Sequence, residues 1–423
     1  MEKQKEYLKG LARELNDITS DNKWDEKRVL WIKKNSLIKT RPLILTMLSL
    51  AAWEELIPHS TLKCEDEFLR EYEWEILRRI YQAKYLQDDE VLTNVFYVPV
   101  DYKFTDWIEG RIRPYSIDGR HAAAFVPSLR EYSDYKKLRK PELVYIDHDK
   151  TNERCALLDD AFGGVLNIEK GQPLRADTDI EIKGWGYSII DVFAELRGLE
   201  DMYTDLILAP DWVHEVMDFL TEGIMGYKET IRKNKLLKLN NNGLVYNCNA
   251  ATGSNALSWT DELPSFGFDP DDIAYKDLWG YSMAQEFSEV SPDMLEEFVI
   301  PYQMRAVNDF GLLSYGCCES LNRKFDVVMK SFPNLRSVSI AYCTDLDIAA
   351  EKLGDRYVFS WKPLSTIMAT FSEKEVTRVM SEAFEKTKKC HTAVALRNTL
   401  TLYGKHENAA TWTNIVMDLA KSF

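Results

Sequence analysis

The sequence predicts an α/β protein whose parallel strands close into a (β/α)8 TIM-type barrel behind an N-terminal helical region. The first observation behind this prediction is that strand-like and helix-like segments alternate through the second half of the chain, an order that produces a parallel sheet. The second is that many such units follow one another without a glycine-rich phosphate turn after the first strand, which argues against a Rossmann dinucleotide site. With 423 residues, of which 45% are hydrophobic, the chain can bury a large core.

Charge, apolar runs and cysteine content exclude several classes of partner. The net charge of −15 argues against nucleic acid, because phosphate contacts need clustered lysine and arginine. The longest apolar run is PLILTMLSLAAW at residues 42–53, which is too short to span a bilayer and which we interpret as a buried helix. Seven cysteines, scattered except for one adjacent pair, fit thiols in a reducing cytoplasm better than a disulfide framework. We therefore expect a cytoplasmic protein that acts on small molecules.

The first 90 residues have the pattern of helices. The segments EKQKEYLKGLARELNDI and CEDEFLREYEWEILRRIYQAKYLQ carry apolar residues at steps of three and four. We predict an N-terminal helical region at 1–90 and the barrel at 91–423. After residue 90, VLTNVFYVPVDY has the composition of strands, whereas the pattern of 103–178 does not define a topology.

The later half of the chain provides the strands of the predicted barrel. Serines before acidic first turns, at Ser291 and Ser372, predict helix starts, and Gly311 and Gly354 are placed where helices should end. The predicted parallel strands are 244–248, 312–317, 336–343, 357–361 and 392–396.

Polar side chains and thiols follow these strands. In a (β/α)8 barrel the chemistry lies at the carboxyl ends of the strands, so we expect these residues to share one rim. They are Asn247, Cys248, Tyr315, Cys317, Cys318, Glu319, Cys343, Trp361, Lys362, Arg397 and Asn398.

Two features of this rim suggest specific chemistry. Cys317, beside Cys318 and Glu319, offers soft and hard ligands of the kind that zinc accepts, although two adjacent cysteines cannot both reach one ion without backbone strain. Arg397 follows a mostly apolar strand, and a buried guanidinium is costly unless it meets an anion. Arg397 is therefore a candidate to orient a substrate carboxylate.

A family resemblance extends over residues 198–423. This part of the chain contains, in order, RGLEDMYTDLILAPDWVHEVMDFL, TDELPSFGFD, DLWGYSMAQEFSEVSPDMLEEFVIPYQ, SYGCCESL and YVFSWKPLS. Together these segments resemble the uroporphyrinogen decarboxylase superfamily, and more closely its corrinoid-dependent methyltransferase branch. The resemblance implies a (β/α)8 barrel behind an N-terminal helical region.

In that branch a strand-end His-x-Cys and a later cysteine hold a zinc ion. The histidine position falls on Tyr315 and the cysteine position on Cys317, and VALRNTLTLYG lacks the later cysteine. A zinc site here would have to use other ligands, for which Cys318, Glu319 and Glu262 are the candidates.

The resemblance also implies a function. We expect the methyltransferase component of an O-demethylase, which moves a methyl group from a small substrate such as an aryl methyl ether to the cobalt of a corrinoid carried by a separate protein. The separate carrier is expected because the chain has no Asp-x-His-x-x-Gly segment for cobalt. The expected catalytic residues are Tyr315, Glu319 and Lys362, and the expected substrate-binding residues are Asn247, Cys248, Trp279, Trp361, Arg397 and Asn398.

Two alternatives remain open. A cofactor-free decarboxylase could use Arg397 and Lys362 to grip substrate carboxylates. A barrel that has kept a ligand pocket and lost its catalytic metal would be a binding protein, as the tyrosine at position 315 permits.

Overall fold

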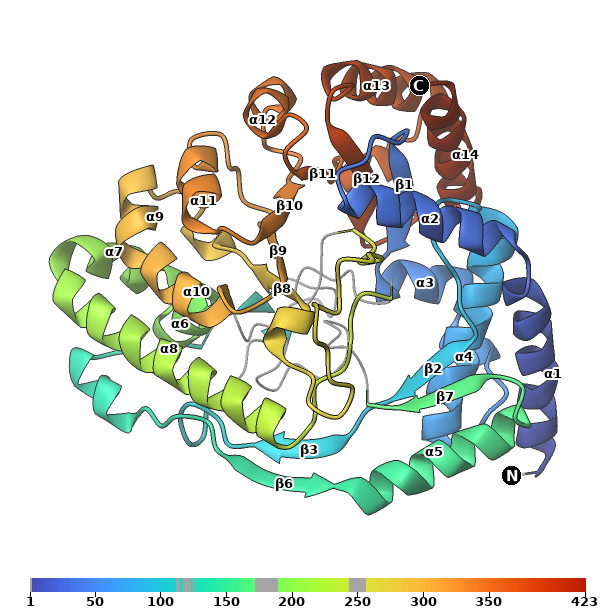
Figure 1. Cartoon of the computed structure of the whole chain (residues 1–423), viewed down its shortest axis with the longest axis horizontal. Coiled ribbons are helices and arrows are strands. Elements are labelled where there is room, and N and C mark those ends of the chain that lie inside the picture. The colour runs from blue at the N-terminus through green and yellow to red at the C-terminus, as the bar shows by residue number, and fades with distance from the viewer. Residues whose placement is uncertain (1, 112–114, 117–122, 125, 172–188, 243–255) are drawn as a thin grey trace. The chain divides into compact units, whose positions relative to one another are not determined.

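The computed structural model describes residues 2–111, 115–116, 123–124, 126–171, 189–242 and 256–423 (Figure 1). The fold is mixed α/β. The chain divides into two compact units. Unit 1 comprises Met1–Asp101, Asp147–Gln172 and Trp361–Phe423, and unit 2 comprises Tyr102–Ile146 and Pro173–Ser360. The domain boundary expected at residues 90 and 91 stays a prediction.

Unit 1 combines the N-terminal helices with the C-terminal end of the chain. Its strands form two parallel pairs, β1 with β12 and β2 with β7. The strands are β1 (Leu43–Leu48), β2 (Val95–Val98), β7 (Asn167–Lys170) and β12 (His391–Thr399). The helices are α1 (Glu2–Thr19), α2 (Lys23–Asn35), α3 (Leu50–Leu56), α4 (Glu67–Tyr81), α5 (His148–Phe162), α13 (Glu373–Lys386) and α14 (Glu407–Ser422).

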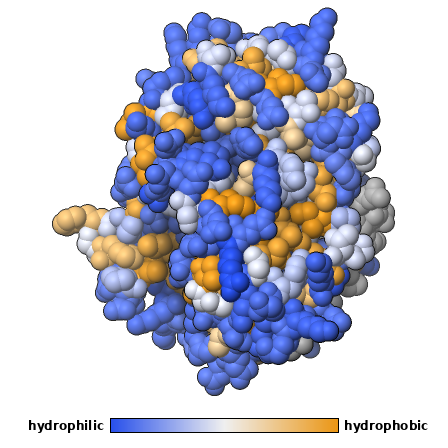
Figure 2. Space-filling view, turned by 90° about the vertical axis from the view of Figure 1, so that its right-hand side faces the viewer, coloured by the Kyte–Doolittle hydropathy of each residue, from blue (hydrophilic) through white to orange (hydrophobic). Residues whose placement is uncertain are grey.

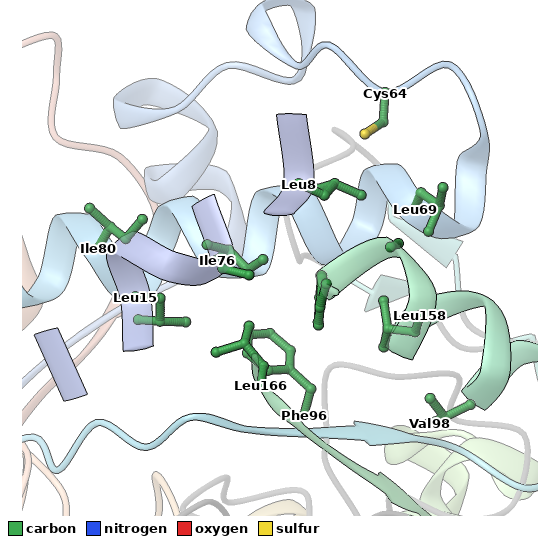
Figure 3. Packing of buried hydrophobic residues seen from close by; sticks show 13 residues of the cluster. Leu8, Leu15, Cys64, Leu69, Ile76, Ile80, Phe96, Val98, Leu158 and Leu166 are labelled. Carbon is green, nitrogen blue, oxygen red and sulfur yellow. The ribbon is translucent and has the colours of Figure 1, made fainter. Parts of the chain in front are cut away.

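The helices of the first 90 residues form where the periodicity predicted them. Leu8 and Leu15 lie on one face of α1, and both are fully buried against α4, α5 and β2 (Figure 3). Phe96 of β2 meets Phe162 of α5 in an edge-on contact with ring centroids 5.2 Å apart. Burial of these side chains, at about 25 cal/mol per Å² of apolar surface removed from water, stabilises this part of unit 1.

The interpretation of residues 42–53 as one buried helix was wrong. Leu43–Leu48 is strand β1, which pairs in parallel with β12, and helix α3 begins only after Ser49. The hydroxyl of Ser49 caps α3 by accepting a hydrogen bond from the backbone N–H of Ala52 at 3.3 Å. A strand buried on both faces is a continuous apolar run, which periodicity does not distinguish from a buried helix.

Aspartate side chains cover the edge of β1 that faces away from β12. The backbone N–H of Thr46 donates to Asp88 at 2.6 Å, and that of Ile44 donates to Asp89 at 2.8 Å. Arg41 pairs with both oxygens of Asp89. These carboxylates take the place that a neighbouring strand would occupy. Within the described residues the sheet is therefore not seen to close into the predicted barrel.

Unit 2 contains the strand after which the adjacent cysteines lie. The strands follow the order β8–β9–β10–β11, and β9 pairs in parallel with both β8 and β10. They are β8 (Trp279–Ser282), β9 (Leu312–Tyr315), β10 (Leu335–Ile340) and β11 (Val358–Trp361), the last residue of which opens a segment of unit 1. The helices are α6 (Ile189–Arg197), α7 (Leu199–Leu208), α8 (Pro210–Lys233), α9 (Pro292–Phe298), α10 (Ile300–Val307), α11 (Phe325–Ser331) and α12 (Leu346–Leu353). Figure 1 shows α10 and α11 beside β8, β9 and β10.

The remaining elements of the chain are short. The two-residue strands β4 (Tyr115–Ser116) and β5 (Ala123–Ala124) form an antiparallel pair, and the remaining strands are β3 (Asp101–Phe104) and β6 (Leu143–Asp147). The short 3₁₀ and π helices are η1 (His59–Thr61), η2 (Gln82–Leu86), η3 (Tyr132–Lys137), η4 (Tyr275–Asp277), η5 (Gln285–Phe287) and η6 (Ser365–Met368).

Four of the five strands predicted in the later half are confirmed. They are β9, β10, β11 and β12, while residues 244–248 lie outside the described residues. The predicted helix starts at Ser291 and Ser372 are also confirmed, because each hydroxyl accepts a hydrogen bond from the first turn of its helix.

The surface drawn in Figure 2 is mostly hydrophilic, with hydrophobic residues in separate patches. In the part of the chain that the structure describes, none of the helices combines the length and the apolar character needed to cross a bilayer.

Glu90, which follows the two aspartates at the edge of β1, predicts a pH dependence of stability. Burial, and then the charge of Asp88, raise the pKa of Glu90 to about 8 from the ordinary value of 4.5. The unfolded chain loses the proton of this carboxyl near pH 4.5 and the folded chain near pH 8. The contribution of the Glu90 carboxyl to the stability of the fold is therefore fully present below pH 4.5 and is lost as the pH rises to 8.

Glu90→Gln should remove this loss because the amide stays neutral. We expect the difference in free energy of unfolding between variant and wild type to grow in favour of the variant from pH 5 to pH 8, as measured by urea unfolding. The exposed Glu351→Gln is the control and should show no such trend. A constant difference across this pH range for Glu90→Gln would contradict the assignment.

Candidate functional site

The carboxyl ends of β8, β9 and β10 form the candidate site in unit 2. Side chains alternate along β8, and a Cβ added to Gly280 would lie 2.6 Å from the ring of Phe310. Trp279 and Tyr281 therefore extend from the opposite face of the strand. Tyr281 packs there with Met283 and Cys317.

Trp279 lies on the same face of β8 as Tyr281, at the start of the strand. Its side chain is fully buried with Leu263 and Leu312, and its indole N–H donates to the carbonyl of Ser258 at 3.0 Å. The structure thus places Trp279 in the core, in a cluster separate from that of Cys317, and its expected contact with substrate stays a prediction.

Glu319 ties the ends of β8 and β9 together. Its carboxylate, 2% exposed, accepts a hydrogen bond from the backbone N–H of Ala284 at 3.1 Å and from that of Cys317 at 2.7 Å. Each carboxylate oxygen is used by one of these bonds, and hydrogen bonds to a charged acceptor are about twice as strong as neutral ones. This geometry makes Glu319 an anchor for the turn that carries Cys317.

The turn after β9 depends on a glycine. Gly316 has φ +97°, a conformation that side chains rarely adopt, and a Cβ at this position would lie 3.2 Å from the carbonyl oxygen of Ser339. The hydroxyl of Tyr281 donates to the carbonyl of Gly316 at 3.0 Å, and the hydroxyl of Ser339 donates to that of Cys317 at 3.2 Å. Hydrogen bonds from β8 and β10 thus fix the backbone of this turn.

Three thiols from two strand ends come together at the turn. The Sγ atoms of Cys317 and Cys318 lie 3.5 Å apart, and the thiol of Cys343, from the loop after β10, contacts the carbonyl oxygen of Cys318 at 3.6 Å. Cys317 is buried, Cys318 is half-buried and Cys343 is exposed. Burial is the largest cause that raises the pKa of the Cys343 thiol, so this group is mainly protonated at neutral pH.

Tyr315 is fully buried just before the turn. Its ring packs on Phe332 with centroids 5.3 Å apart, on the face of β9 opposite to Ser314. Burial, and then the charge of Glu319, raise the pKa of Tyr315 well above 10, so the phenol stays protonated. Within the described residues its hydroxyl has no hydrogen-bond partner.

Glu262 is not brought to the cysteines. It forms a two-pronged ion pair with Arg336, at 2.5 and 2.8 Å, near the start of β10. Ser339, which contacts Cys317, lies three residues further along the strand, a rise of about 10 Å. The ion pair and this separation argue against Glu262 as a ligand that shares a metal ion with Cys317.

The described donors do not fit a zinc ion. Among the residues that the structure describes, no three of the types His, Cys, Asp and Glu are arranged to hold a metal ion. Cys317 and Cys318 supply two thiols, but both oxygens of Glu319 are already bonded to backbone N–H groups. The zinc expected from the family resemblance stays a prediction.

The remaining predicted residues belong to unit 1 or lie outside the description. Trp361 ends β11, and the buried Lys362 follows it; within the described residues the Nζ atom of Lys362 has no hydrogen-bond partner. Arg397 and Asn398 are in β12. Asn247 and Cys248 lie outside the described residues. A cavity shared by Cys248, Cys317, Trp361 and Arg397 therefore stays a prediction.

Sequence reasoning missed two residues that position the thiols. Tyr281 and Ser339 hold the carbonyls of Gly316 and Cys317, yet both look like ordinary strand residues in WGYS and SVSI. The alternation of WGYS, with its glycine between two aromatic residues, is the signal that could have identified the face on which Tyr281 lies.

Comparison with known proteins does not define a family. No protein-family model matches the chain, and no curated protein matches it significantly. Among solved structures, a methyltransferase from Methanosarcina mazei is similar over 94% of this chain and 98% of that chain, with 11% sequence identity and a TM-score of 0.45. A likeness at this level carries no argument about function.

The anchoring role of Glu319 predicts the result of its removal. Glu319→Gln replaces one acceptor oxygen by an NH2 group, which leaves one buried N–H without its acceptor. We expect the free energy of unfolding to fall by about 1 to 3 kcal/mol. Urea unfolding measures this change, and Glu289→Gln, an exposed change in the preceding loop, is the control. Equal stability of the two variants would contradict the anchoring role.

Proposed function

We propose that this chain is the methyltransferase component of an O-demethylase, which transfers a methyl group from an aryl methyl ether to the cobalt of a separate corrinoid protein. The observation that carries the proposal is the buried side chain of Lys362, directly after the carboxyl end of strand β11, whose Nζ atom has no hydrogen-bond partner within the described residues. This is the end of parallel α/β units at which catalytic groups gather. The order of segments over residues 198–423 that resembles the methyltransferase branch supports the same function.

The reaction needs help at the oxygen that the methyl group leaves. A phenolate is a poor leaving group unless a cation or a proton donor meets its developing charge. Lys362 fits this requirement because its Nζ atom is buried and has no hydrogen-bond partner among the described residues. An unpaired buried charge is costly, so an anionic oxygen placed next to it is stabilised.

Each participant would have a defined task. The corrinoid of the partner protein would supply the nucleophilic metal that accepts the methyl carbon. Lys362 would donate a proton to the departing phenolate oxygen. The carrier would be a second protein that approaches the carboxyl ends of the strands, and we propose that its interface is transient and polar.

A decarboxylase is the second candidate, and Lys362 also favours it. A buried ammonium group with no hydrogen-bond partner in the described part of the chain is suited to a substrate carboxylate as well as to a phenolate. The two candidates differ in their products, since the first methylates cobalt and the second releases carbon dioxide without a corrinoid.

Methyl transfer can be followed by the absorbance of cobalt. The chain is incubated without oxygen with a corrinoid protein reduced to the cob(I) state and a panel of aryl methyl ethers that includes a methoxybenzoate. We expect conversion to the methyl-cobalt spectrum with at least one ether, and no conversion without enzyme or ether. Release of carbon dioxide from the methoxybenzoate in the absence of corrinoid would establish the decarboxylase instead.

The role of Lys362 is tested by a matched pair of variants. Lys362→Gln should slow methyl transfer by about 10²- to 10⁴-fold, the usual contribution of a positioned proton donor. Lys374→Gln, an exposed change on α13, should keep the wild-type rate. The loss in Lys362→Gln should be smaller for ethers whose phenols are more acidic, because these leaving groups need less protonation. A uniform loss across the series would assign Lys362 a structural role.

A further inference from the structure

The adjacent thiols at the turn after β9 have a geometry that the proposed methyl transfer does not use. The Sγ atoms of Cys317 and Cys318 lie 3.5 Å apart. We propose that Cys317 and Cys318 form a redox-active dithiol, which oxidises reversibly to a vicinal disulfide. This inference does not depend on the chemistry proposed for the substrate.

The turn holds the two thiols close to each other before any reaction. The backbone is fixed at the carbonyl of Gly316 by Tyr281, at the N–H of Cys317 by Glu319 and at the carbonyl of Cys317 by Ser339. These contacts come from three different segments of unit 2. Because the pair is already in contact on a fixed backbone, little conformational freedom is lost when a bond forms between the sulfur atoms.

The difference in burial sets the order of the chemical steps. Cys318 is half-buried, whereas Cys317 is 3% exposed, so a small oxidant such as hydrogen peroxide reaches Cys318 before Cys317. The Cys318 sulfur attacks one peroxide oxygen, the O–O bond breaks, and a sulfenic acid and one water are formed. The Cys317 sulfur then attacks the sulfenic sulfur, the S–O bond breaks, and the disulfide and a second water are formed. Two thiols are oxidised and one peroxide is reduced.

The disulfide would be easy to reduce. Consecutive Cα atoms are about 3.8 Å apart across a trans peptide, while ordinary disulfides join Cα atoms about 4.4 to 6.8 Å apart. A bridge between neighbours therefore stores strain, and strained disulfides have higher reduction potentials. Reversibility is the property that distinguishes a labile pair of this kind from a structural disulfide.

Cys343 is the competing partner for Cys318. Its thiol contacts the carbonyl oxygen of Cys318 at 3.6 Å and comes from the loop after β10. Bond formation between Cys318 and Cys343 would connect two strand ends and would contradict the vicinal pair. The two outcomes give different peptides, so one experiment separates them.

The full-length protein is treated with hydrogen peroxide and digested with trypsin after its remaining thiols are alkylated. Cleavage after Arg305 and Arg323 releases the peptide 306–323, which contains Cys317 and Cys318 and no other cysteine. We expect this peptide to lose two hydrogen atoms and both alkylation sites after peroxide, and to regain both sites after dithiothreitol. Mass spectrometry of the intact and fragmented peptide measures these changes.

Variants and folding controls complete the test. Cys343→Ser should leave the loss of two hydrogen atoms unchanged, whereas Cys318→Ser should abolish it. Thermal unfolding in reducing buffer shows that each variant is folded, and alkylation of the untreated wild type shows that both thiols are accessible to the assay. A peptide 306–323 linked to the peptide that contains Cys343 would overturn the proposal. Oxygen-bearing cysteines in 306–323 with no internal disulfide would also overturn it.

Discussion

The buried carboxylate of Glu319 is the constraint on which the geometry of the candidate site depends. A carboxylate removed from water is costly unless hydrogen bonds satisfy it, and this one accepts the N–H groups of Ala284 and Cys317. Those two bonds join the segment after β8 to the segment after β9. The position of Cys317 against Tyr281 and Met283, and its contact with Cys318, follow from that connection. Glu319, which the sequence predicted to be a catalytic residue, thus positions the turn that contains Cys317.

The elements were predictable where the pattern of apolar residues has one interpretation. Amphipathic helices such as α1 and α4 were identified by steps of three and four, and β9 to β12 by short apolar runs between helices. Strand β1 was not, because a run buried on both faces has no alternation. The closed barrel was not found within the described residues, where Asp88 and Asp89 bond the edge of β1 that faces away from β12. The periodicity of apolar residues does not show which groups will bond the edge of a strand.

The candidate site was predictable in its place along the chain and less so in its contacts. The rule that polar residues follow parallel strands pointed to Cys317, Cys318 and Cys343, which the structure brings to one turn. It did not show that Glu262 would pair with Arg336, or that both oxygens of Glu319 would bond the backbone. Long-range pairs of this kind depend on the fold.

The proposed methyl transfer breaks the bond between oxygen and the methyl carbon. A methoxybenzoate labelled with ¹³C at both the methoxy and the carboxyl carbon tests this in one measurement. The labelled compound is incubated with the chain and a reduced corrinoid protein, and the products are followed by ¹³C NMR. Methyl transfer predicts a labelled methyl group on cobalt and a hydroxybenzoate that keeps its labelled carboxyl. Labelled carbon dioxide together with an intact methoxy signal would contradict the claim.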